Sequence, residues 1–214
     1  MADAVLADDF DVVVEHDVMV AMRDGVRLAT DIHKPARDGE PVPGYFPVLF
    51  ERTPYGKTGL RDSEGTSADP RPRRRADVAA YFVRCGYVVV FQDCRGRYAS
   101  EGVFTKYLGE AEDGFDSIAW ITGQPWCSGK VGTFGMSYAS HAQTALVALR
   151  PSGLSAMLLD SGGFANAYRG GIRHGGAFEL KQATWAYKQA ALSLKAQGDH
   201  EALAALEKED IAEW

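Results

Sequence analysis

Apolar and polar residues alternate along the first part of the chain in the pattern of two paired strands. Residues 12–14 and 18–22 are rich in valine, and residues 26–33 alternate apolar with polar side chains. Between them, Arg23-Asp24-Gly25 has the composition of a tight turn. The pattern predicts an antiparallel hairpin at the start of a sheet.

Short continuous apolar runs then alternate with segments of helical spacing. Continuous runs are typical of parallel strands covered on both faces, and apolar residues three or four apart are typical of amphipathic helices. The predicted elements are, in order, a strand at 47–50, a helix at 76–84, a strand at 87–91, a helix at 110–121, a strand at 131–134, a helix at 138–149 and a strand at 154–159. This alternation implies right-handed crossovers and a mostly parallel sheet. We therefore predict an α/β fold with the layout of an α/β-hydrolase core.

The pattern changes after residue 163. Residues 177–196 and 200–214 predict two consecutive helices with no strand between them. We accordingly divide the chain into a core over residues 1–163 and a helical segment over residues 164–214. A polar stretch over residues 52–75 predicts a long loop within the core.

Composition and charge limit the classes of partner. The 214 residues are 46% apolar, enough to bury a core, and the formal net charge is −6. Nucleic-acid binders need clustered basic residues. The basic cluster here, Arg71, Arg73, Arg74 and Arg75, is interpreted as a solvated loop that leads into a helix. We predict no nucleic-acid partner.

The cysteines indicate a reducing compartment, and the apolar runs are too short for a membrane helix. Cys85, Cys94 and Cys127 are an odd number with no C-x-x-C pair, so neither a disulfide framework nor a thiolate zinc site is indicated. No run reaches the roughly 18 apolar residues of a membrane helix, and residues 1–11 lack the basic start of a secretory signal. We predict a cytoplasmic protein that binds no membrane, metal or cofactor.

The candidate chemistry follows the strand at 131–134. There, Gly135-Met136-Ser137-Tyr138-Ala139-Ser140 has the context of a nucleophile elbow, the sharp strand-to-helix turn that exposes a catalytic serine. Such a turn needs small neighbours, which Gly135, Ala139 and Ser140 provide, and the helix start supplies N–H groups for an oxyanion. The common motif ends in glycine where this chain has Ala139. A serine that only caps the helix is the alternative.

Several further motifs occur in the order known from one family. They are Met22-Arg23-Asp24-Gly25-Val26-Arg27-Leu28, Arg52-Thr53-Pro54-Tyr55-Gly56-Lys57, Gln92-Asp93-Cys94-Arg95-Gly96-Arg97 with Ser100-Glu101-Gly102, Glu112-Asp113-Gly114-Phe115-Asp116, Gln124-Pro125-Trp126-Cys127 with Gly129, and Gly135-Met136-Ser137-Tyr138. Collinear over about residues 18–165, the sequence resembles the CocE/NonD hydrolases, the group of cocaine esterases, α-amino-acid ester hydrolases and Xaa-Pro dipeptidyl-peptidases.

The resemblance implies roles for three residues. Ser137 would be the nucleophile, and the backbone N–H of Tyr138 with the hydroxyl of Tyr55 would form the oxyanion hole. For Tyr55, a loop tyrosine that packs its ring is the alternative. The implied activity is hydrolysis of a small-molecule ester, amide or short peptide through an acyl-enzyme on Ser137. Neither the substrate nor the oligomeric state follows from the resemblance.

An activated serine also needs a histidine base and an orienting carboxylate, which follow it along α/β-hydrolase chains. The histidines after the elbow are His141, His174 and His200, and none of them follows a late strand. Asp160 ends the strand after the elbow helix and is interpreted as a cap for the next turn, with a role as the orienting carboxylate as the alternative. Cysteine chemistry at Cys94 or Cys127 is disfavoured because neither lies at an elbow.

Family members continue through a helical cap, further strands that carry the acid and base, and a C-terminal jelly-roll domain. The resemblance therefore implies that residues 164–214 begin the cap, that the late strands and jelly roll are absent, and that the triad partners lie past Trp214. On this interpretation the chain alone is nearly inactive. A non-catalytic or degenerate α/β-hydrolase module is the alternative.

Four charged residues near the elbow are assigned to structure. Asp93 and Arg95 follow the strand at 87–91 and are interpreted as an internal ion pair that holds their loop. Asp113 and Asp116 lie at the start of a helix, where acidic residues suit the helix dipole.

Overall fold

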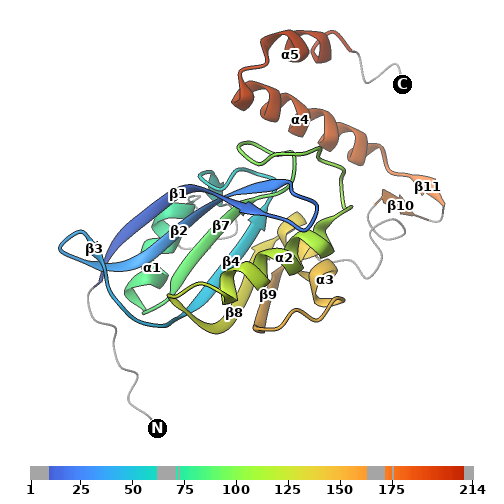
Figure 1. Cartoon of the computed structure of the whole chain (residues 1–214). Coiled ribbons are helices and arrows are strands. Elements are labelled where there is room, and N and C mark those ends of the chain that lie inside the picture. Colours follow the sequence, from blue (N-terminus) through green and yellow to red (C-terminus); the bar gives the residue numbers. More distant parts are fainter. Residues whose placement is uncertain (1–9, 62–70, 72, 163–171, 175, 210–214) are drawn as a thin grey trace.

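A mixed sheet forms the centre of the computed structural model, which describes residues 10–61, 71, 73–162, 172–174 and 176–209 (Figure 1). The strand order is β1-β2-β7-β4-β8-β9, with the short β3 paired to β2. The strands are β1 Asp11–Ala21, β2 Arg27–Arg37, β3 Glu40–Pro41, β4 Phe46–Thr53, β7 Val88–Asp93, β8 Cys127–Met136 and β9 Leu154–Asp160. β2 pairs antiparallel with β1 on one side and with β7 on the other, whereas β7, β4, β8 and β9 are parallel. The predicted fold class is confirmed.

The β1–β2 hairpin is longer than the alternation predicts and contains a bulge. Its register shifts between Glu15 and Val18, and Asp17 has a left-handed φ of 52°. A bulge takes residues out of the ladder and bends the strand. This explains why the apolar pattern is interrupted between the two valine-rich stretches that predicted the strand.

Helices α1, α2 and α3 cover the two faces of the sheet (Figure 1). On one face, α2 (Glu110–Thr122) and α3 (Tyr138–Val147) pack against Val88 and Val90. On the other face, α1 (Arg75–Arg84) packs against Val89 and Phe91. Alternate residues of β7 therefore point into two cores, which is why this strand has a continuous apolar run.

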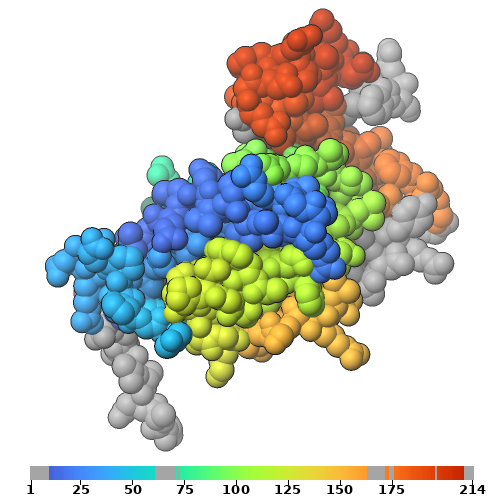
Figure 2. Space-filling view, in the orientation of Figure 1, coloured from blue at the N-terminus to red at the C-terminus, as the bar shows by residue number. Residues whose placement is uncertain are grey.

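The second part of the chain forms a layer of its own beside one end of the sheet (Figures 1 and 2). A small hairpin of β10 (Arg173–His174) and β11 (Ala177–Phe178) leads into α4 (Leu180–Gln197), and α5 (His200–Leu206) follows without an intervening strand. The two consecutive helices were predicted, but the start at residue 177 is wrong because 177–178 pair in β11. The proposed division at residue 163/164 involves residues 163–171, which lie outside the described residues, and it stays a prediction.

β9 ends the strand order and leaves apolar side chains uncovered. Leu158 and Leu159 are 67% and 43% exposed, whereas the neighbouring β8 is largely buried. An edge strand presents unpaired backbone groups, and exposed leucines on it favour association with other surfaces.

The loop predicted over residues 52–75 contains a short antiparallel pair, β5 (Leu60–Arg61) and β6 (Arg73–Arg74). The interpretation of the basic cluster as wholly solvated is wrong for one member. Arg75 is buried, and its guanidinium pairs with Glu51 at 3.2 Å and donates to the carbonyl oxygens of Gly56 and Leu60. Arg75 therefore fastens the loop to the end of β4.

Candidate active site

Ser137 lies on the sharp turn that connects β8 to α3. Its backbone has φ 57° and ψ −113°, and the residue is solvent-exposed. The Ser137 N–H donates to the carbonyl of Asp160 at 2.9 Å, and the Ser137 carbonyl accepts from the N–H of Ser140 at 3.1 Å. A positive φ is unfavourable for a serine, so the surrounding contacts must hold this conformation. The turn presents the hydroxyl at the carboxyl edge of the parallel strands.

Small residues around the turn are required by close backbone approach. A Cβ added to Gly135, whose φ is 152°, would lie 2.5 Å from the Cβ of Ala139. A Cβ on Gly162 would lie 2.5 Å from the Ser137 carbonyl oxygen. The Ser140 Oγ lies 2.7 Å from the Gly135 carbonyl oxygen and accepts the Asp160 N–H at 3.1 Å. Gly135, Ala139 and Ser140 were predicted from the motif, whereas the role of Gly162 depends on the return of β9 beside the turn.

Replacing Gly162 with alanine should destabilise the turn, because the new methyl group meets rigid backbone and not a flexible side chain. We expect the free energy of unfolding to fall by about 1–3 kcal/mol, the usual cost of overpacking. Urea unfolding followed by circular dichroism measures it. Gly123→Ala is the matched control, since a Cβ there is at an ordinary 3.5 Å from its nearest neighbour. Equal losses in the two variants would contradict the prediction.

The Tyr138 side chain fastens the start of α3 to α2. It is 3% exposed, and its hydroxyl donates to Glu110 Oε1 at 2.9 Å. The Tyr138 hydroxyl oxygen accepts the Tyr107 N–H at 2.9 Å. Glu110 in turn pairs with Arg52 at 2.8 Å. Burial and the nearby Glu110 carboxylate raise the pKa of Tyr138 well above its usual range, so the phenol stays protonated. The Tyr138 N–H is the first of α3 and therefore has no acceptor within the helix.

Tyr55 follows β4, the parallel neighbour of β8, so it lies at the same edge of the sheet as Ser137. It is half-buried, and its ring centroid is 6.4 Å from that of Trp185 in α4. Trp185 also stacks on Tyr138, with centroids 5.9 Å apart and an angle of 2° between the planes. The two residues predicted to form an oxyanion hole therefore contact the same indole ring.

An aromatic cluster beside the turn was not predicted. Phe104 lies 5.8 Å from Tyr138 and 6.2 Å from Trp185, and Tyr107 stacks on Tyr138 at 5.1 Å. Lys106 lies over the Trp185 ring at 3.8 Å. These residues come from the β7–α2 loop and from α4, which lie side by side in Figure 1. No local pattern in the sequence marks their meeting.

The structure brings no histidine into hydrogen-bonding contact with the Ser137 hydroxyl within the described part of the chain. His141 is buried one turn into α3, packed on Tyr107 at 4.6 Å, and burial lowers its pKa. His200 begins α5 and is exposed. The side chain of His174 lies outside the described residues. Asp160 serves the turn through its backbone and accepts the Ser161 hydroxyl at 2.8 Å.

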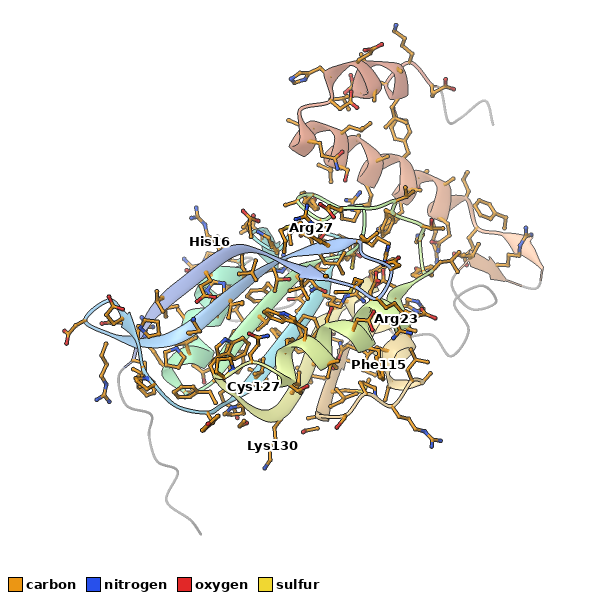
Figure 3. The ribbon with its side chains drawn as sticks, in the orientation of Figure 1. His16, Arg23, Arg27, Phe115, Cys127 and Lys130 are labelled. Carbon is orange, nitrogen blue, oxygen red and sulfur yellow. The ribbon has the colours of Figure 1, made fainter. Side chains whose placement is uncertain are left out.

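The ordered motifs form ion pairs that fix the β7–α2 loop. The expected pair between Asp93 and Arg95 is wrong, because Arg95 pairs with Asp24 at 2.7 Å and with Asp113. Arg23 pairs with Asp116 at 2.7 Å, lies over the Phe115 ring and joins the hairpin turn to α2 (Figure 3). The charges of these side chains are paired with one another. The contacts therefore fit the interpretation that Asp113 and Asp116 have structural roles.

Asp93 is buried and bonded to backbone, accepting the Lys57 N–H at 2.7 Å. Burial raises its pKa to about 6. The Asp93 carboxyl thus binds its proton more tightly in the folded protein than in the unfolded chain. Its contribution to the free energy of unfolding is complete below pH 4 and is lost as the pH rises through 6. Because a pKa unit corresponds to about 1.4 kcal/mol, Asp93→Asn should gain about 2–3 kcal/mol relative to the unchanged protein between pH 4 and pH 7.

Urea unfolding at the two pH values tests this expectation. Asp116→Asn is a control of opposite sign, because hydrogen bonding to Arg23 lowers the pKa of Asp116 and its contribution is lost as the pH falls. If the free energy of unfolding of Asp93→Asn differed from that of the unchanged protein by the same amount at both pH values, the prediction would be contradicted.

The described residues contain no cluster of three or more His, Cys, Asp or Glu side chains suited to a metal ion. Cys85, Cys94 and Cys127 are all free thiols, and burial raises the pKa of Cys94, which disfavours a reactive thiolate. No helix in the described ranges is both long enough and apolar enough to cross a membrane.

Known proteins resemble this chain in sequence and in structure. The family model for X-Pro dipeptidyl-peptidases of the S15 family matches residues 24–213. A cocaine esterase from Rhodococcus sp. (strain MB1 Bresler) is 42% identical over 144 residues, which are 67% of this chain and 23% of that protein. A CocE/NonD family hydrolase from Staphylococcus aureus superposes with a TM-score of 0.69 at 27% identity, covering 92% of this chain and 36% of that one.

A solved α-amino acid ester hydrolase superposes with a TM-score of 0.53 at 30% identity, covering 71% of this chain and 25% of that one. The chain thus spans about a quarter of the length of the curated esterase it matches and about a third of the staphylococcal hydrolase.

Proposed function

Because the chain belongs to the X-Pro dipeptidyl-peptidase (S15) family, we propose that Ser137 is the nucleophile of a serine hydrolase that cleaves a small ester, amide or short peptide. The observation that carries the proposal is the strained, exposed turn at Ser137. Four small neighbours hold this turn in place, and they are Gly135, Ala139, Ser140 and Gly162. Strain at one exposed serine costs stability without improving packing, and such strain gathers at functional sites.

The reaction proceeds by acyl transfer. The Ser137 Oγ attacks the carbonyl carbon, its proton passes to a base, and the carbonyl oxygen becomes an oxyanion. The Tyr138 N–H and the Tyr55 hydroxyl donate to that oxyanion. Collapse of the tetrahedral intermediate breaks the bond to the leaving group, which takes the proton back from the base and departs as an alcohol or amine. Water, deprotonated by the same base, then attacks the acyl carbon, and the Ser137 ester bond breaks to release the acid and restore the serine.

The positions of Tyr55 and Tyr138 support this assignment. Both lie beside Trp185, and both follow parallel strands at the edge where ligands gather in α/β sheets. The Glu110–Tyr138 hydrogen bond keeps the first turn of α3 in place. The backbone N–H groups of that turn therefore have a fixed direction before substrate binds. Preorganised donors of this kind contribute more in a site that excludes water.

Labelling by a fluorophosphonate probe tests the nucleophile. The complete product of the gene that encodes this chain should be labelled on the peptide that contains Ser137, identified by mass spectrometry. Failure of the complete product to react would favour a non-catalytic α/β module.

Tyr55→Phe should lower kcat for p-nitrophenyl acetate by about 10²–10³ while KM changes little, because the hydroxyl acts on the transition state. The ring is kept, so its contact with Trp185 persists. Tyr45→Phe is the control, since that tyrosine is 77% exposed before β4. An unchanged kcat in Tyr55→Phe would support the alternative that Tyr55 only packs its ring.

A further inference from the structure

A pocket of about 410 Å³ lies between α4 and the β7–α2 loop, and one of its lining residues, Phe104, also contacts Tyr138. We call it the α4 pocket and define it by Arg97, Phe104, Lys106, Gln189, Ser193 and Leu194, among its lining residues. Its volume suits a small organic molecule. Apolar atoms, including the stems of the polar side chains, form most of the wall, and no carboxylate is among its lining residues.

Arg97 differs from the other buried cations that the structure describes. Arg52, Lys57 and Arg75 each pair with a buried carboxylate, at 2.8, 2.8 and 3.2 Å. Arg97 is 2% exposed, yet in the described part of the chain its guanidinium donates only to uncharged oxygens. These are the Pro54 carbonyl at 2.9 Å and the Gln189 carbonyl and side chain at 2.7 and 2.9 Å. Burial lowers the pKa of Arg97, and the nearby Asp93 carboxylate opposes that effect only in part. A buried charge that is not directly paired with a carboxylate is costly.

Lys106 adds a second cation without a carboxylate partner among the described residues. Its ammonium group is hydrogen-bonded to the Gln182 side chain and lies between the rings of Trp185 and Tyr107, at 3.8 and 5.0 Å. Burial lowers the pKa of Lys106 to about 8. Two positive charges therefore face one apolar pocket in a protein whose formal net charge is −6.

Ser193 supplies an unsatisfied donor in the same wall. It is 7% exposed, and its Oγ has no hydrogen-bond partner among the described residues. A buried hydroxyl left without a partner costs about 1–3 kcal/mol, so such groups usually meet a ligand or water.

We propose that the α4 pocket binds the carboxylate of a small ligand with an aryl or alkyl body, at a site separate from the Ser137 turn. The ammonium of Lys106 and the hydroxyl of Ser193 donate to the carboxylate, and Arg97 adds positive potential while it keeps its own hydrogen bonds. Phe104 and Leu194 contact the apolar body. A charge-assisted bond in a partly dry site is stronger than a neutral one, so the pocket prefers the acid anion to a neutral molecule of the same shape.

Isothermal titration at pH 7 of the complete gene product with 4-phenylbutanoate and with its neutral amide, 4-phenylbutanamide, tests the proposal. The carboxylate should bind about tenfold more tightly than the amide. Lys106→Gln should remove that preference, and Ser193→Ala should reduce the carboxylate affinity by about three- to tenfold. Lys130→Gln is the matched control and should keep the preference, because Lys130 is exposed on β8, at the end of the molecule away from α4 (Figure 3).

Equal affinities for the two probes, or loss of the preference in Lys130→Gln, would overturn the proposal. Ser137→Ala should bind both probes unchanged, so the result is independent of the proposed hydrolase activity. Circular dichroism of each variant verifies folding. If Lys106→Gln unfolds, Ser193→Ala still tests the proposal, because it removes a single oxygen atom.

Discussion

Ser137→Ala should lower the kcat of the complete gene product for p-nitrophenyl acetate by a factor on the order of 10⁴ or more, without loss of stability. The oxygen atom removed is the proposed nucleophile, and loss of a triad nucleophile leaves only the catalysis supplied by binding and by the oxyanion hole. Folding should not suffer, because the described hydrogen bonds of Ser137 are made by its backbone, which alanine retains. Initial-rate kinetics and thermal unfolding measure the two quantities.

The matched control is Ser155→Ala. Ser155 is an exposed serine on β9 whose hydroxyl donates to the carbonyl of Gly153 at 3.0 Å. Its variant should keep full activity. If Ser137→Ala retained more than about a tenth of the activity, Ser137 would not be the nucleophile, and the alternative that it caps α3 would gain support.

Local patterns predicted most of the core because the physics that forms those elements is local. The β1–β2 hairpin follows from period-two alternation around a turn, and the turn at Ser137 follows from a strand, small residues and a helix start in succession. The ordered motifs also predicted the family, which the comparisons confirm.

Properties that depend on distant parts of the chain were missed. Trp185 lies 47 residues after Tyr138 in the sequence, yet the two rings stack, and only the docking of α4 on the β7–α2 loop brings them together. Arg95 was given the wrong partner because Asp93 is near in sequence, whereas Asp24 and Asp113 are near in space. Charge alone does not choose among several acids, since the choice depends on tertiary packing.

Arg52→Met should cause the largest loss of stability among the substitutions considered. The Arg52 side chain is 1% exposed and pairs with Glu110 at 2.8 Å and with Asp113 at 3.4 Å, and its Nε donates to Gln92 at 3.0 Å. Methionine fills much of the space but leaves buried carboxylates without their cation. Such a loss typically costs about 3–5 kcal/mol. A domain of ordinary stability, about 5–15 kcal/mol, would then be close to unfolding.

Thermal and urea unfolding measure this loss, and two further variants separate its causes. Arg23→Met removes an ion pair whose arginine is 52% exposed, and it should change the unfolding midpoint much less. Adding Glu110→Gln to Arg52→Met should recover part of the stability, because it removes one of the unpaired charges while keeping an acceptor for the Tyr138 hydroxyl. Recovery would show that the stranded charge, and not a cavity, causes the loss. The double variant could instead lose as much free energy of unfolding as Arg52→Met and Glu110→Gln lose together. In that case Arg52 would act by packing, and the elbow would not depend on the Arg52–Glu110–Tyr138 connection.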